Sequence, residues 1–120
     1  MTRVLVCGSR GPLSKETVEL VRDTLSGIRH ARSFSALIHG YATGVDAQAA
    51  KWAKAAGIKT IGYMADWSRH GKAAGPIRNQ RMIDTGKPDL VVAFRGGRGT
   101  ADMVRRAKIA GIELLLPEER

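Results

Sequence analysis

The pattern of apolar and polar positions alternates between two periods along the chain. Short unbroken apolar runs are separated by longer stretches in which apolar residues recur every three or four positions, as on one face of a helix. Runs of this kind are expected where helices cover a parallel sheet on both faces. The pattern therefore predicts an α/β fold, a three-layer sandwich around a five-stranded, mainly parallel sheet, in a single domain of residues 1–120. The expected strands are 4–7, 36–39, 60–64, 90–94 and 112–116.

Residues that start or stop helices stand where this alternation requires them. Ser14 precedes the first helical pattern and is a typical N-cap. Pro76 suits the first turn of a helix that we expect to begin near it. Gly111 is a natural end for the last helix.

Charge adds a prediction about partners. Lys and Arg number 20 against 11 Asp and Glu, a net charge of +9 that favours an anionic partner such as nucleic acid, nucleotide or phosphate ester. General solubility is the alternative explanation. The single cysteine, Cys7, cannot form an internal disulfide, and no signal peptide or membrane-spanning run is visible. We expect a cytoplasmic protein with no membrane partner, and no metal or cofactor, because metal-ligand spacing is lacking.

In sheets of this kind, ligands bind outside the carboxyl ends of the strands, where the strand order reverses. The loop after the first expected strand contains Gly8, Ser9 and Arg10, whose hydroxyl and guanidinium suit a phosphate or ribose contact. An ordinary turn leading to the next helix is the alternative.

The loop after the second expected strand holds two glycines, Gly40 and Gly44, which allow close backbone approach. Thr43 and Asp46 are three apart, a spacing that resembles a capping box at the start of the next helix. We expect capping as the main role of Asp46, with a ribose contact as its alternative, and ligand contact for the loop backbone.

A basic helical segment precedes the fourth expected strand. Arg78 and Arg81 are three apart and share a helix face, with Asn79 beside them. Two neighbouring guanidiniums favour an anion between them, whereas the alternative is a solvated basic face.

The loop after the fourth expected strand is the most glycine-rich. Its glycines leave backbone amides accessible to an anion, Arg95 or Arg98 supplies charge, and Thr100 is expected to cap the following helix. The spacing does not fit a P-loop, because no Gly-Lys-Ser/Thr follows. The glycines are Gly96, Gly97 and Gly99.

Taken with these loops, the chain resembles the SLOG superfamily, specifically its small stand-alone YspA-like branch. The resemblance rests on HGYATGVDAQAAKWA, ADW, GPIRNQRM and PDLVVAFRGGRGTADMVRRA, and runs from VLVCGSR to AGI. It implies a Rossmann-like fold with strand order 3-2-1-4-5, nucleotide-related ligands and a homo-oligomer.

Two relatives within the superfamily imply different activities. The LOG phosphoribohydrolases carry the motif Pro-Gly-Gly-x-Gly-Thr-x-x-Glu. In this chain Arg95 replaces the proline, and Met103 occupies the position of the catalytic glutamate. Asp102 or Asp46 would therefore have to supply the carboxylate that such a hydrolase needs. DNA-processing protein A binds single-stranded DNA, and its motifs resemble 40–46 and Arg78-Asn79. Tyr41 and Trp67 are the aromatic residues placed to stack on a base, although anchoring is the alternative role for Trp67.

We expect a module that senses or sequesters a nucleotide or nucleotide-derived phosphate ligand at the carboxyl ends of the strands. The first alternative is an N-glycosidase or phosphoribohydrolase acting on nucleoside 5′-monophosphates, and the second is single-stranded nucleic-acid binding.

Overall fold

Five strands form one parallel sheet in the computed structural model, which describes residues 1–118. The strands are β1 (Thr2–Cys7), β2 (Phe34–His39), β3 (Lys59–Gly62), β4 (Leu90–Ala93) and β5 (Glu113–Leu115). Their order, β3-β2-β1-β4-β5, confirms the predicted Rossmann-like topology. Since β1 lies between β2 and β4, the strand order reverses at β1 and β4, whose last residues Cys7 and Ala93 are in register.

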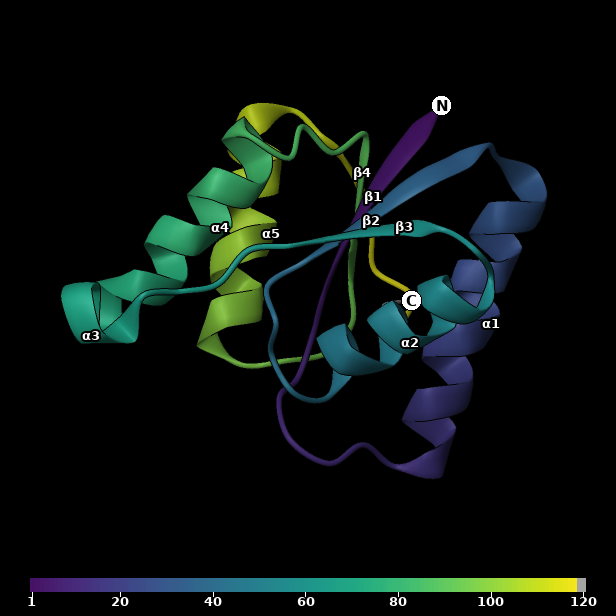
Figure 1. Ribbon diagram of the computed structural model, residues 1–120, viewed down its shortest axis with the longest axis horizontal. Coiled ribbons are helices and arrows are strands. Elements are labelled where there is room, and N and C mark those ends of the chain that lie inside the picture. The colour runs from purple at the N-terminus through teal and green to yellow at the C-terminus, as the bar shows by residue number, and fades with distance from the viewer. Residues whose placement is uncertain (119–120) are drawn as a thin grey trace.

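Helices cover both faces of the sheet, as the uninterrupted apolar strands predict (Figure 1). One face carries α1 (Lys15–Ala31) and α2 (Val45–Ala55). The other carries α4 (Ala74–Asp84) and α5 (Arg98–Ala110), while the short α3 (Trp67–His70) and the 3₁₀ turn η1 (Gly71–Ala73) project beyond the sheet before α4.

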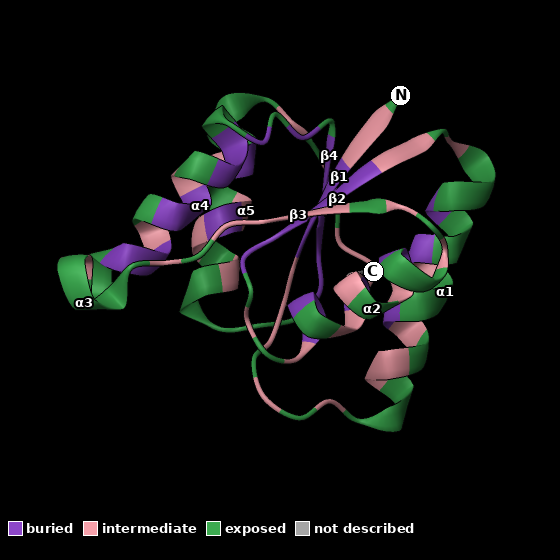
Figure 2. Ribbon diagram, in the orientation of Figure 1, coloured by how far each residue is buried: buried purple, intermediate pink, exposed green. Residues whose placement is uncertain are grey.

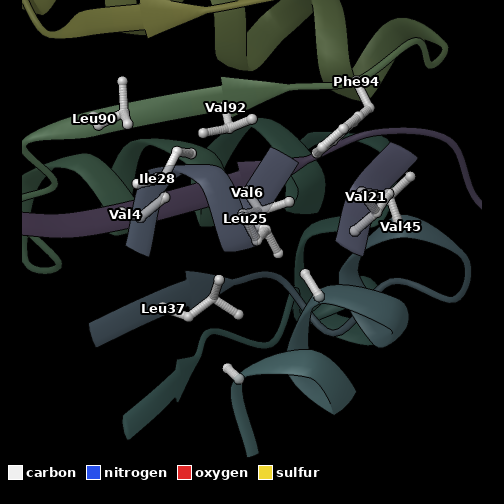
Figure 3. Packing of buried hydrophobic residues seen from close by; sticks show 12 residues of the cluster. Val4, Val6, Val21, Leu25, Ile28, Leu37, Val45, Leu90, Val92 and Phe94 are labelled. Carbon is white, nitrogen blue, oxygen red and sulfur yellow. The ribbon is translucent and has the colours of Figure 1, made fainter. Parts of the chain in front are cut away.

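Successive side chains of a strand point to opposite faces of the sheet, and this divides the interior into two cores. Val4 and Val6 of β1 pack with Leu25 of α1 on one face (Figure 3). Leu5, between them in the sequence, points to the other face and packs with Met103 of α5. Figure 2 shows the result, with the middle of the sheet buried and the outward sides of the helices exposed.

The three helix ends predicted from Ser14, Pro76 and Gly111 agree with the structure. Ser14 caps α1 by accepting from Thr17 N–H, and Gly111 ends α5 in the left-handed conformation at φ 71°. The helix expected to begin near Pro76 begins at Ala74, directly after η1, which places Pro76 in its first turn as predicted. No helix within residues 1–118 is long and apolar enough to cross a membrane.

Candidate functional site

A cavity of about 670 Å³ opens at the carboxyl ends of the central strands. Its walls come from the end of β1 and the loop that follows it, the loop before α2, the α3–α4 region and the first turn of α5. Segments far apart in the chain therefore meet at the point where the strand order reverses. Predicted residues that line the cavity are Gly8, Ser9, Arg10, Asp46, Arg78, Asn79, Gly97, Arg98, Gly99, Thr100 and Asp102.

The loops after β1 and β4 are packed directly against each other. The N–H of Ser9 donates to the carbonyl of Arg95 at 2.9 Å. A Cβ added to Gly96 would lie 2.9 Å from the backbone carbon of Gly8 and would overlap the side chain of Thr100. Gly96 therefore lets the backbones of these two loops approach closely, although Gly96 itself does not line the cavity. Other predicted residues outside the cavity wall are Gly40, Thr43, Gly44 and Arg81.

Asp46 is buried, and its carboxylate holds the loop that precedes α2. Oδ2 accepts from the N–H groups of Gly40 at 2.9 Å and Ala42 at 3.2 Å. Burial raises the pKa of Asp46, although these two N–H groups, His39 and Arg78 act in the opposite direction. Asp46 thus satisfies backbone donors, but those of the loop and not of the helix.

The capping box predicted for α2 is wrong. The N-cap is Gly44, and no side chain accepts from the first turn of α2. The hydroxyl of Thr43 instead accepts from Gly11 N–H at 2.9 Å, which ties the loop after β2 to the loop after β1. The two polar side chains therefore fix the loops to one another.

Arg78 on α4 lines the cavity and is 7 % exposed. Its Nη1 donates to the carbonyl oxygen of Gly40 at 2.6 Å, and its Nε donates to Oδ1 of Asn79 at 3.1 Å. Burial lowers the pKa of Arg78, while Asp46 acts to raise it. Nη2 has no acceptor within residues 1–118, so this donor is free to bind a ligand in the cavity.

The first turn of α5 presents uncapped backbone amides to the cavity. Gly97 is the N-cap, and no side chain accepts a hydrogen bond there. The N–H groups of Arg98, Gly99 and Thr100 have no partner within the helix, whose first internal donor is Ala101. The expected capping role of Thr100 is therefore wrong, since Thr100 lies inside the first turn. An uncapped helix start of this kind attracts anions.

Asp102 lines the cavity, but neither of its oxygens is free. Oδ1 accepts from Arg105 at 2.8 Å, and Oδ2 accepts from Arg106 at 2.8 Å and Asn79 at 3.0 Å. Burial would raise the pKa of Asp102, but these hydrogen bonds outweigh it and hold the pKa below its usual value. Met103, which aligns with the glutamate of the LOG phosphoribohydrolase motif, is fully buried in the core under α5.

Of Arg81, Tyr41 and Trp67, only Trp67 lines the cavity. Arg81 is exposed outside the cavity, where its guanidinium lies 5.5 Å from the ring centre of Tyr63. Tyr41 is also exposed and is not part of the cavity wall. Trp67 does line the cavity, with the Arg10 guanidinium 5.4 Å from its ring centre.

Several wall residues were not predicted from the sequence. Lys72 adds a cation from η1, an element too short to show helical periodicity. Cys7 ends β1 at the cavity, where burial and then the Asp46 carboxylate raise the pKa of the thiol to about 12. Within residues 1–118, no three His, Cys, Asp or Glu side chains gather in an arrangement able to hold a metal ion.

Sequence comparison finds two matches. The profile of the family described as "YspA, cpYpsA-related SLOG family" matches residues 2–70. The Gene 61 protein of Mycobacterium phage D29 is 37 % identical over 125 residues, which cover 96 % of this chain and 95 % of that protein.

Solved structures share the fold at lower identity. TM1055, a structural-genomics target, matches 95 % of this chain and 72 % of its own with a TM-score of 0.76 at 20 % identity. DNA processing protein A from Streptococcus pneumoniae matches 96 % of this chain with a TM-score of 0.75 at 21 % identity, over 50 % of its own length. The molybdenum cofactor carrier protein from Chlamydomonas reinhardtii matches 97 % of this chain and 76 % of its own, with a TM-score of 0.70 at 24 % identity.

Proposed function

The chain belongs to the YspA, cpYpsA-related SLOG family, and on that premise we propose that it binds a nucleotide or a nucleotide-derived phosphate ligand in the cavity at the carboxyl ends of β1 and β4. Binding without turnover would serve to sense or to sequester the ligand. The carrier protein among the structural relatives is named for holding a cofactor.

One observation carries this proposal: the free Nη2 of buried Arg78 and the uncapped amides of α5 line the same cavity. The helix start alone stabilises an anion by roughly 0.3–1 kcal/mol at an exposed site. A charge-assisted hydrogen bond from the guanidinium contributes about 1.5–3 kcal/mol. Arg10, Lys72 and Arg98 add charge around the same opening, and the cavity volume lies in the range typical of small-molecule sites.

Hydrolysis of a base–sugar bond requires a carboxylate that reaches the sugar or a water molecule. Asp102 is held by two arginines and an asparagine, so it is unsuited to that role. Met103 lies in the core and cannot replace the missing glutamate. These contacts argue against an N-glycosidase that relies on Asp102 or Met103. The carboxylate of Asp46 also lines the cavity, and an assay for release of free base tests it.

Isothermal titration calorimetry with nucleoside mono- and diphosphates, ADP-ribose and inorganic phosphate tests the proposal. We expect saturable binding of at least one phosphate ligand. Chromatography of the same mixtures should show no release of free base. Absence of heat across the whole panel would rule out the proposed function.

A further inference from the structure

Asp46 has one carboxylate oxygen that the protein does not use. Oδ2 accepts from two backbone N–H groups, whereas no donor within residues 1–118 reaches Oδ1. Every fully buried side-chain nitrogen or oxygen in that part of the chain has a hydrogen-bond partner, so Oδ1 cannot be sealed in the core. Since Asp46 is 6 % exposed and lines the cavity, Oδ1 is an acceptor directed at the ligand space.

An unpaired carboxylate oxygen is out of place in a cavity built only for phosphate. A second negative charge repels the phosphate, and burying an acceptor without a donor destabilises the complex. The charge of Arg78 offsets part of this repulsion, but its hydrogen bonds go to Gly40 and Asn79, and none reaches Oδ1 of Asp46. A ligand that brings its own donor next to the phosphate is therefore favoured.

The residues along α4 suggest which part of the ligand carries this donor. Trp67 packs beside Gly75, where an added Cβ would lie 3.3 Å from the ring. Asn79, about one helical turn (roughly 6 Å) further along, donates to the carbonyl of Gly99 at the start of α5. Arg78 lies between these points and reaches Gly40, the same residue whose N–H binds Asp46.

A ligand that extends from the aromatic ring of Trp67 to the amides of α5 shares the cavity with Arg78 and Asp46, which line it as well. In a nucleotide, the group between the base and the phosphate is the sugar. Its hydroxyls are the donors that would meet a free acceptor there.

We propose that Asp46 is a specificity-determining residue that accepts a hydrogen bond from a ribose hydroxyl, so that the cavity selects ribonucleotides over deoxyribonucleotides. This inference rests on the proposed function, because it needs a nucleotide phosphate in the cavity. A site built to bind a hydroxyl rejects an analogue that lacks it by a large factor.

Calorimetry on the full chain tests the inference with AMP, 2′-deoxy-AMP, 3′-deoxy-AMP and IMP, and with ribose 5-phosphate against 2-deoxyribose 5-phosphate. We expect at least one deoxy compound to bind about tenfold or more weakly than its ribose parent. In Asp46→Asn the amide oxygen still accepts from the loop and an NH₂ group replaces Oδ1, so we expect phosphate binding to remain. We expect the ribose preference to fall, because the hydroxyl loses its charged acceptor and can only accept from the amide.

The outcomes separate the two proposals. Equal affinities for ribose and deoxyribose compounds in the wild-type protein overturn the role of Asp46 and leave phosphate binding intact. If AMP binds more tightly than IMP while the sugar hydroxyls make no difference, the donor lies on the base. That result also overturns the proposed role of Asp46. No binding of any phosphate, including inorganic phosphate, overturns the proposed function itself. Should Asp46→Asn fail to fold, the wild-type ratios alone decide.

Discussion

The guanidinium of Arg78 donates to the carbonyl oxygen of Gly40 at 2.6 Å and so links α4 to the loop after β2. A Cβ on Gly40 would lie 2.6 Å from Nη1 of Arg78, so only glycine leaves room for the guanidinium. The contact joins α4 to the loop that leads into α2 on the opposite face of the sheet. It holds one side of the guanidinium in place and leaves Nη2 for a ligand.

Replacing Arg78 should weaken phosphate binding. In Arg78→Gln the charge is lost and the carbonyl of Gly40 loses its donor, so we expect roughly 10- to 100-fold weaker binding and about 1–3 kcal/mol lower stability. Calorimetry and urea unfolding measure the two effects. Arg81→Gln is the matched control, since Arg81 lies on the same helix outside the cavity. Equal losses of affinity in both variants would contradict a specific role for Arg78.

The close approach of two loops should make Gly96 intolerant of a side chain. In Gly96→Ala the new Cβ would overlap Thr100 and press on the backbone of Gly8, so we expect a loss of about 1–3 kcal/mol in the free energy of unfolding. Gly99→Ala is the control, because no atom lies within 4 Å of its added Cβ. Urea unfolding of both variants checks this, and similar stabilities would show that the loops are not packed as described.

The environment of His39 should make stability depend on pH. His39 is 6 % exposed, and its Nδ1 accepts from Tyr41 N–H at 3.1 Å, which a protonated ring cannot do. Burial lowers the pKa of His39 below 6.5, although Asp46 opposes the shift. As the pH falls, His39 therefore takes up a proton in the unfolded chain before it does so in the folded protein. The stability that neutral His39 contributes above pH 6.5 is lost as the pH drops through its folded-state pKa.

His39→Gln lacks this titration. We expect wild-type stability relative to His39→Gln to fall between pH 7 and pH 5, by about 1.4 kcal/mol for each unit by which the pKa is lowered. Urea unfolding at both pH values measures the difference. A difference that stays constant, or that grows in favour of the wild type, would show that the ring is not buried in its neutral form.

The response to salt should separate a small ligand from nucleic acid. A mononucleotide held by a few contacts should lose about tenfold or less in affinity between 50 and 200 mM salt. A strand spread over the surface of a chain with net charge +9 should lose about 10³-fold or more if it made six or more phosphate contacts. Fluorescence anisotropy with a labelled oligonucleotide, beside calorimetry with the nucleotide, compares the two. Tight, steeply salt-dependent oligonucleotide binding with no nucleotide binding would favour the nucleic-acid alternative.

The sequence predicts the fold well because its signals are local. Strands apolar on both faces predicted a covered parallel sheet, and the rule that ligands bind where strand order reverses placed the cavity beside Gly8 and Gly97. The helical spacing of Arg78 and Arg81 could not show which of them points inward, because that depends on Gly40 and Tyr63 from other elements.

Other features of the site required long-range contacts. Asp46 was expected to cap its own helix, and only the folded loop shows that it turns back to Gly40. The pairing of Asp102 with Arg105 and Arg106 was readable from the i,i+3 and i,i+4 spacing. The hydrogen bond from Asn79 to Asp102 could not be read from the sequence, because Asn79 lies on a different helix.

The convergence of amides and guanidiniums from separate loops on one phosphate can be observed in a ¹⁵N-resolved NMR titration with AMP and inorganic phosphate. We predict saturable shifts of the backbone amides of residues 8–10 and 98–100, with the Arg78 side chain responding at the same ligand concentration. Shifts spread over the outer faces of α1 and α2, or no shifts at the cavity while the ligand is bound, would show that the phosphate does not bind where these loops meet.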